Sequence, residues 1–133
     1  SGKHWCEFSA RVRYADVDQM GFAYYSNYLV WMEVGRTELL RSLGISYKEL
    51  EEQGIFLPVS HLECKYIRPA RYDDLLDIYT CISRVRRTRV DFEYKIVNST
   101  TKDELLTGST VLACLDSKSR PSRLPENLKE LIC

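Results

Sequence analysis

The residues whose side chains are best suited to take part in a reaction lie together within 14–28. Asp16 and Asp18 stand two positions apart there, next to a strongly apolar segment that begins near Ser26. A carboxylate held beside such a segment is a candidate general base or nucleophile. The spacing alone allows a structural interpretation equally well, in which the aspartates solvate a turn and Ser26 or Asn27 caps a helix.

The sequence contains few residues that could support other kinds of catalytic chemistry. The two histidines are His4, near the N-terminus, and His61, which we interpret as a surface strand residue, so a serine or cysteine nucleophile would lack an activating partner. The five cysteines are widely spaced without a C-x-x-C pair, which argues against a disulfide framework and against a zinc site. Free cysteines in apolar segments are typical of a reducing compartment, and we therefore expect a cytoplasmic protein.

The composition limits the kinds of partner. The 133 residues carry 19 basic and 19 acidic side chains, so no overall field draws the chain to nucleic acid or to an anionic membrane surface. Apolar residues make up 44% and charged residues 29%, and the apolar runs are shorter than the roughly 20 residues that span a bilayer. We expect one domain over 1–133, with residues 1–2 a remnant of an expression tag and no visible export signal.

The spacing of apolar residues predicts a strand, a loop and a long helix in the first third of the chain. Strict alternation over 7–14 predicts a strand, and 15–25 is predicted to be an ordered loop. Apolar residues at three- and four-residue steps predict a helix over 26–43 that is buried on most sides. Gly44 follows as its left-handed cap.

The rest of the chain is predicted to be mostly sheet. Ser46 and Glu49 first suggest the capping box of a short helix that Gly54 would end. Strands are then predicted at 57–67, 75–85, 89–97 and 105–115, and a last short helix at 125–132. Short joints between the strands imply an antiparallel sheet. The predicted class is therefore α+β, with a sheet curled round one long helix and a second chain covering the flank that the sheet cannot wrap.

A longer motif carries a resemblance to a known family. The string Tyr14-x-Asp16-x-Asp18-x-x-Gly21-x-x-Tyr24-Tyr25-x-x-Tyr28 is followed by Trp31-x-Glu33-x-x-Arg36 and later by Tyr72-Asp73-Asp74. The pattern resembles the 4-hydroxybenzoyl-CoA thioesterase family, which includes the YbgC-type acyl-CoA thioesterases, over about residues 8–115. The resemblance implies a hotdog fold, in which a curved five-stranded antiparallel sheet wraps a long central helix.

The resemblance also implies roles for residues of the loop. Asp18 would be the catalytic carboxylate, acting as a nucleophile or as a base that activates water. The backbone N–H of Tyr25 would receive the thioester carbonyl oxygen, a role that suits a helix N-terminus because its N–H donors are free and partially positive. Gly21 would bend the loop beside the acyl group. For Asp16 we favour a loop hydrogen-bonding role over a supporting catalytic one.

Three further positions match substrate contacts of that family. Glu33 corresponds to a helix carboxylate that reaches the far end of the acyl group in the aromatic-specific enzymes, although contacts with Arg36 or Thr37 would explain it structurally. Arg86 and Arg87 correspond to basic residues that bind the phosphates of CoA. A solvated turn between strands is the structural alternative for these two arginines.

Two departures from the family pattern concern the subtype and the phosphate contacts. Tyr25 stands where YbgC-type members carry histidine, and it matches the tyrosine of the 4-hydroxybenzoyl-CoA enzymes, so the subtype stays open. Thr88 stands where a lysine is frequent, and the neighbouring Arg89 is a candidate substitute. In the family that the sequence resembles, the oxyanion contact comes from the main chain, so the resemblance implies that the loss of histidine does not by itself remove activity.

The function implied is hydrolysis of an acyl-CoA thioester to the free acid and CoA, without a metal or other cofactor. We expect a homo-oligomer, either a dimer or a dimer of dimers, with a site shared between two subunits. One alternative is a hydratase or dehydratase, which usually needs a histidine that this loop lacks. Another is a non-catalytic module that binds acyl-CoA or acyl-carrier protein. The sequence does not specify the acyl group, which depends on pocket shape.

Overall fold

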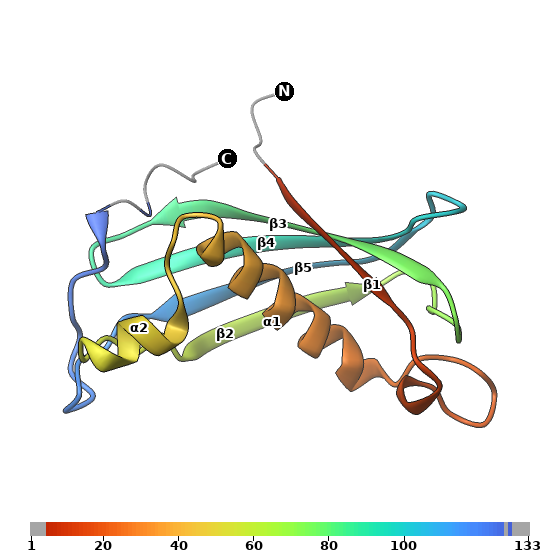
Figure 1. The fold of residues 1–133 in the computed structure, drawn as a ribbon, viewed down its shortest axis with the longest axis horizontal. Helices are drawn as coiled ribbons and strands as arrows, with labels where there is room; N and C mark the ends of the chain where they lie inside the picture. The colour runs from red at the N-terminus through yellow and green to blue at the C-terminus, as the bar shows by residue number, and fades with distance from the viewer. Residues whose placement is uncertain (1–4, 127, 129–133) are drawn as a thin grey trace.

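Five antiparallel strands form a sheet that curves round a long helix within residues 5–126 and 128, which the computed structural model describes (Figure 1). The sheet order is β1-β3-β4-β5-β2, so β1 and β2 form its edges. The strands are β1 (Cys6–Arg11), β2 (Val59–Tyr66), β3 (Leu75–Val85), β4 (Arg89–Asn98) and β5 (Glu104–Ala113). The hotdog arrangement predicted from the sequence is confirmed.

The long helix α1 (Tyr25–Arg41) packs across the sheet and contacts β3 most closely. Gly35 permits this approach, because a Cβ atom at that position would collide with Thr80 Oγ1 and lie 3.0 Å from Ile78 Cγ2. Helix α1 begins one residue earlier and ends two residues earlier than the helix that the apolar pattern predicted at 26–43. The largest fully buried side chains of the core come from α1, the sheet and the C-terminal segment: Met32, Leu39, Leu40, Leu76, Ile78, Ile82, Phe92, Tyr94, Ile96, Leu106, Leu112 and Leu128.

The first strand ends sooner than its alternating pattern predicts. The expectation was 7–14, but β1 stops at Arg11 and a 3-10 turn follows at Tyr14–Asp16. The cause is local: the Asp16 carboxylate accepts hydrogen bonds from the Arg13 backbone N–H at 2.8 Å and from the Arg13 guanidinium at 2.8 and 3.2 Å. Side-chain bonds to nearby backbone compete with the strand ladder, and here they redirect the chain into the loop.

The glycine ends predicted after α1 are confirmed, and one of the two bonds of the predicted Ser46–Glu49 capping box is present. Gly44 has φ 76° and Gly54 has φ 80°, both in the left-handed region that glycine adopts readily. Between them lies α2 (Tyr47–Glu52), whose N-cap Ser46 accepts a hydrogen bond from the Glu49 N–H at 3.1 Å. The last helix expected at 125–132 falls largely on residues outside the described part of the chain.

One flank of the molecule stays open in a single chain. The prediction that α1 is buried on most sides holds for its sheet-facing side, but Val30 of α1 is 53% exposed and Leu29 is 36% exposed. The neighbouring edge strand β2 is exposed at nearly every position, Leu62 at 41% among them. An apolar helix flank beside an unpaired strand edge is a surface that proteins usually cover.

The described residues also bear on cysteine chemistry and membranes. Cys6, Cys64, Cys81 and Cys114 form no disulfide within the described part of the chain. Within that part, no helix combines the length and the apolar character needed to cross a bilayer. Nor do those residues include a group of His, Cys, Asp and Glu side chains arranged to hold a metal ion.

Candidate active site

The loop after β1 holds the Asp18 carboxylate in a fixed position. Asp18 Oδ1 accepts hydrogen bonds from the Met20 N–H at 2.8 Å and from the Phe22 N–H at 3.2 Å. The Asp18 backbone N–H donates to the Phe22 carbonyl at 2.9 Å, and the Gly21 N–H donates to the Asp18 carbonyl at 3.0 Å. Among the described residues, the hydrogen bonds to the Asp18 carboxylate all end on Oδ1, and Asp18 is only half-buried, so Oδ2 is available to a reacting group.

Gly21 forms the bend of this loop. Its φ is 82°, a conformation that disfavours residues with a side chain, although a Cβ atom would meet no heavy atom within 4 Å. The Gly21 carbonyl also accepts a hydrogen bond from the Tyr72 N–H at 3.2 Å, which ties the loop to the segment before β3. The turn role of Gly21 rests on its backbone angle, and its predicted contact with the acyl group stays a prediction.

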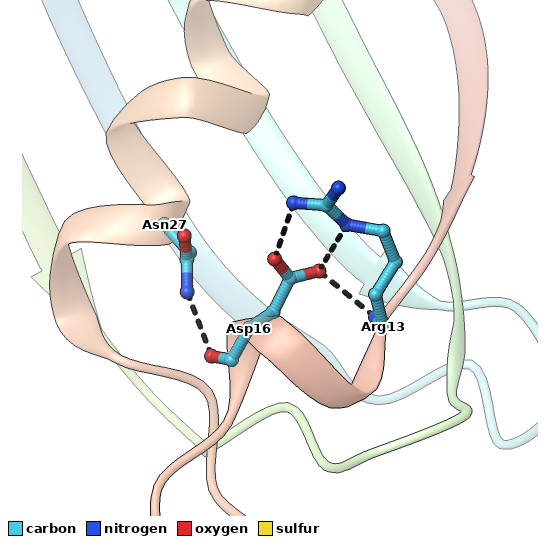
Figure 2. A network of polar contacts seen from close by, with 3 residues as sticks. All are labelled: Arg13, Asp16 and Asn27. Atoms are coloured by element: carbon cyan, nitrogen blue, oxygen red, sulfur yellow. Dashed lines mark hydrogen bonds and ion pairs between the residues drawn. The ribbon is translucent and has the colours of Figure 1, made fainter.

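Asp16 connects the loop to the start of α1 (Figure 2). Its side chain is 4% exposed and binds Arg13, while its carbonyl accepts hydrogen bonds from the Asn27 side-chain amide at 2.7 Å and from the Tyr24 N–H at 3.0 Å. The hydrogen-bonded Arg13 guanidinium holds the pKa of Asp16 below its usual range. Asp16 is therefore engaged in structural bonds, as we favoured from the sequence.

The N-terminus of α1 lacks the cap that the structural interpretation required. Ser26 and Asn27 were the candidates, but the N-cap residue is Tyr24, and among the described residues no side chain caps the helix. The Asn27 side-chain amide binds the Asp16 carbonyl instead. The first turn also contains no acidic residue. Because the first N–H groups of a helix have no intrahelical acceptor, the Tyr25 amide keeps its donor capacity.

Tyr25 lies at the surface and beside the β2 edge. Its side chain is 75% exposed, and its carbonyl accepts a hydrogen bond from the Tyr66 hydroxyl at 3.2 Å. Tyr66 is the last residue of β2, so the helix N-terminus lies at one end of the open edge strand. Loop, helix start and strand edge thus meet in one place that is exposed in a single chain.

Glu33 lines a groove between α1 and β2. The groove has a volume of about 280 Å³ and is lined by Leu29, Val30, Glu33, Arg36, Val59 and Leu62. The salt bridge that would have explained Glu33 structurally is absent among the described residues: Glu33 and Arg36 form no ion pair, and the Thr37 hydroxyl donates to the Glu33 carbonyl at 2.8 Å rather than to its carboxylate. Arg36 is buried in this groove, a position that our sequence analysis did not assign to the site.

The two predicted phosphate contacts differ in their surroundings. Arg86 Nη2 donates to Asp91 Oδ1 at 2.6 Å, which fixes Arg86 within the turn between β3 and β4. Arg87 is exposed and its carbonyl accepts a hydrogen bond from the Leu124 N–H at 3.1 Å. A small cavity of about 210 Å³ here is lined by Arg86, Arg87 and also Arg123.

Arg123 is a basic residue that the sequence analysis missed. It joins the arginine turn because the C-terminal segment folds back over it, and no short-range pattern around Arg123 signals that contact. The position of Arg36, in contrast, is indicated by the sequence pattern of the helix. It lies four residues after the buried Met32 and four before the buried Leu40, so a charged residue interrupts the apolar stripe of α1.

The structure brings some predicted site residues together and separates others. Asp18, Gly21 and Tyr25 share one end of the molecule, where β1 ends opposite the start of β3. The turn that carries Arg86 and Arg87 follows the other end of β3 (Figure 1). With 11 residues in β3, the two ends lie about 33 Å apart. Within one chain, the arginine turn therefore lies far from Asp18.

Comparison with known proteins places the chain in a family. Residues 12–132 match the model of the thioesterase-like superfamily. The chain is 35% identical over 116 residues to the putative acyl-CoA thioesterase YneP of Bacillus subtilis, with 87% of this chain and 83% of YneP covered. It is 36% identical over 120 residues to the acyl-CoA thioester hydrolase YbgC of Escherichia coli, with 89% and 88% covered.

Solved structures agree with this placement. A probable thioesterase from Bartonella henselae superposes with a TM-score of 0.86 at 35% identity, covering 92% of this chain and all of that chain. The fold agreement thus extends over most of this chain. On the family match over 12–132 and on relatives of this similarity, the chain belongs to the thioesterase-like superfamily.

Proposed function

We propose that this protein hydrolyses acyl-CoA thioesters to the free acid and CoA, with Asp18 as the catalytic carboxylate. The observation that carries the proposal is the uncapped N-terminus of α1, tied through Asp16 to the loop that fixes Asp18. A thioester carbonyl that accepts a hydrogen bond from the Tyr25 N–H would be polarised where negative charge develops. One such donor accelerates a reaction by about 10²- to 10³-fold.

In this mechanism Asp18 removes a proton from a water molecule that attacks the polarised carbonyl, or attacks that carbonyl itself to form a mixed anhydride. In the second case a water molecule then hydrolyses the anhydride, which releases the free acid and restores the Asp18 carboxylate. Oδ1 is engaged by the Met20 and Phe22 amides, so Oδ2 is the oxygen we assign to the reaction. The leaving group is the thiolate of CoA, which needs little help to depart. None of these steps requires a metal or a redox cofactor.

We further propose that the working unit is a homodimer joined through β2. Pairing β2 with its copy about a twofold axis would satisfy the open strand edge and would close over the apolar groove that Leu29, Val30 and Leu62 line, shielding these exposed side chains from bulk water without filling the groove. The same axis reverses the strands, so the partner's arginine turn would lie toward this chain's Asp18 loop. A CoA molecule could then reach Asp18 with its thioester and the partner's Arg87 with its phosphates.

Pairing of two such dimers into a tetramer, and a location in the cytoplasm, are further parts of this proposal. The outer face of the sheet has a hollow of about 790 Å³, with Lys65 and Lys95 interspersed with Glu63 and Glu93, a mixture of charges suited to a polar contact between copies. The free thiols of the described residues suit a reducing compartment.

The test is a panel of acyl-CoA thioesters given to the purified full chain, with release of free CoA thiol as the measurement. Aliphatic chains of increasing length and aromatic acyl groups should be included, and a blank without substrate corrects for the protein's own cysteines. We expect thiol release with at least one class. Tight acyl-CoA binding with no thiol release for any member would instead identify a non-catalytic binding module and would refute the proposal.

A further inference from the structure

Arg36 is a buried cation without an anionic partner in the described part of the chain. Its side chain comes from the fourth turn of α1 and the residue is 9% exposed. Nη1 lies 3.5 Å from the Tyr94 hydroxyl, and within the described residues Nε has no hydrogen-bond partner and no carboxylate lies at ion-pair distance. A buried guanidinium left in this state is costly, and proteins normally pair it.

The groups that surround Arg36 are neutral hydroxyls. The Tyr94 hydroxyl shares a hydrogen bond of 2.7 Å with Thr110 Oγ1, and the buried Tyr47 hydroxyl lacks a partner among the described residues. Burial raises the pKa of both Tyr47 and Tyr94, while the nearby Arg36 opposes that rise. Both phenols are therefore protonated at neutral pH, and neither supplies a charge to balance Arg36.

Arg36 also forms part of the wall of the groove between α1 and β2. Four of the six lining residues, Leu29, Val30, Val59 and Leu62, are apolar, so an aliphatic chain would fit between them. The groove follows α1 away from the proposed carbonyl site at Tyr25. Arg36 lies eleven positions along the helix, about 16 Å on its axis, and helical side chains lean back toward the N-terminus, which shortens the gap.

We propose that Arg36 determines substrate specificity by binding a carboxylate at the far end of the acyl group, so that the preferred substrates are thioesters of dicarboxylic acids. This inference rests on the proposed thioesterase function. The apolar walls would hold the methylene chain, and the guanidinium would bind the terminal carboxylate through paired hydrogen bonds. The substrate then supplies the anion that the described chain lacks.

Glu33 lines the same groove and carries the opposite charge to Arg36. Because Glu33 is exposed, water screens its repulsion of an incoming carboxylate, whereas the buried Arg36 is screened less. Arg36 therefore dominates the preference. Removing the charge with Glu33→Gln should improve the use of dicarboxylic substrates by a few-fold, because repulsion between like charges disappears.

The experiment compares thioesters of equal chain length that end in carboxylate or methyl. Adipoyl-, suberoyl- and sebacoyl-CoA are paired with hexanoyl-, octanoyl- and decanoyl-CoA, and kcat and KM are measured for wild type, Arg36→Met and Arg36→Lys. We expect wild type to prefer the carboxylate at one of these lengths. Arg36→Met should reduce kcat/KM for that substrate by about ten- to a hundredfold, mainly through KM, and should reduce kcat/KM for the methyl-terminated thioester of the same length far less.

Arg41→Met is the matched control, because Arg41 lies on the same helix but pairs with Glu38 at 3.4 Å outside the groove. It should leave the preference intact, and Arg36→Lys should keep part of it. The inference is overturned if wild type hydrolyses both series without preference, if Arg36→Met affects both equally, or if it only dissociates the dimer. A complete lack of thiol release from every thioester would instead refute the thioesterase proposal itself.

Discussion

Asp18 and Phe22 form a reciprocal pair across the loop that precedes α1. The Asp18 N–H donates to the Phe22 carbonyl at 2.9 Å, and the Phe22 N–H donates to the Asp18 carboxylate at 3.2 Å. Two hydrogen bonds in opposite directions fix both the backbone and the side chain, so the carboxylate is oriented before substrate arrives. Such preorganisation is what a catalytic carboxylate needs, because the geometry costs nothing at the moment of reaction.

Asp16→Asn should destabilise the protein at neutral pH by about 1.5–3 kcal/mol, the range for a hydrogen bond to a charged group. The Arg13 hydrogen bonds hold the pKa of Asp16 below its usual range. Their contribution is therefore complete above about pH 4, the ordinary value for an unfolded aspartate, and is lost as the pH falls through the folded-state pKa. Urea unfolding at pH 7 and at pH 3 measures the difference in free energy of unfolding between wild type and Asp16→Asn, which should be smaller at pH 3.

Asp73→Asn serves as the control for that comparison. Asp73 pairs with Arg11 at 3.8 Å on the surface, where ion pairs contribute at most about 1 kcal/mol. If the loss in free energy of unfolding caused by Asp16→Asn is the same at pH 7 and at pH 3, the role assigned to the Asp16 charge is contradicted.

Leu62→Asp should convert a dimer into a monomer. Leu62 is 41% exposed on the edge strand β2, and a charge there would be buried by pairing with a second chain. Activity should fall together with the dimer, because the proposed site draws its arginine turn from the partner. Sedimentation velocity gives the oligomeric state, and Thr100→Asp, in the exposed turn between β4 and β5, is the matched control. A fully active monomer would contradict the shared site.

Arg87→Gln should weaken binding of the nucleotide part of CoA. We expect KM to rise about fivefold for an acyl-CoA, equivalent to about 1 kcal/mol, and to stay unchanged for the same acyl group on pantetheine, which lacks the nucleotide. Arg123→Gln should behave similarly because it lines the same small cavity. Arg120→Gln is the control, since Arg120 binds Asp116 at 3.2 Å away from that cavity. Equal changes with both carriers would remove these arginines from the phosphate site.

The sequence predicted the central strands well because their pattern depends on one simple rule. In β4, buried and less buried residues alternate, and the predicted bounds 89–97 agree with Arg89–Asn98 to within one residue. The bounds predicted for β3, 75–85, agree with Leu75–Val85. The prediction was wrong at the end of β1. The alternating pattern continues to Tyr14, but the strand ends at Arg11 because the Asp16 carboxylate accepts a hydrogen bond from the Arg13 backbone N–H and the chain turns there. A side-chain bond to the backbone three residues away leaves no trace in a hydrophobic pattern.

The candidate site was predictable where it depends on a local motif and unpredictable where it depends on distant packing. The Asp18 loop and the start of α1 are contiguous in sequence, so the motif placed them together. The approach of Arg123 to Arg87 is set by the path of the C-terminal segment, which spacing does not report. Arg36 lies between these cases, because its place on the apolar stripe indicated burial but not the absence of an anionic partner among the described residues.

The most direct test of the account is the rate of thiol release by Asp18→Asn, measured with the best substrate under single-turnover conditions. Asparagine can keep the hydrogen bonds from the Met20 and Phe22 amides, so the loop should stay folded and acyl-CoA should still bind. We predict that thiol release falls by about 10²- to 10⁴-fold while Kd for acyl-CoA changes little. Thiol release at the wild-type rate by Asp18→Asn would contradict the assignment of Asp18.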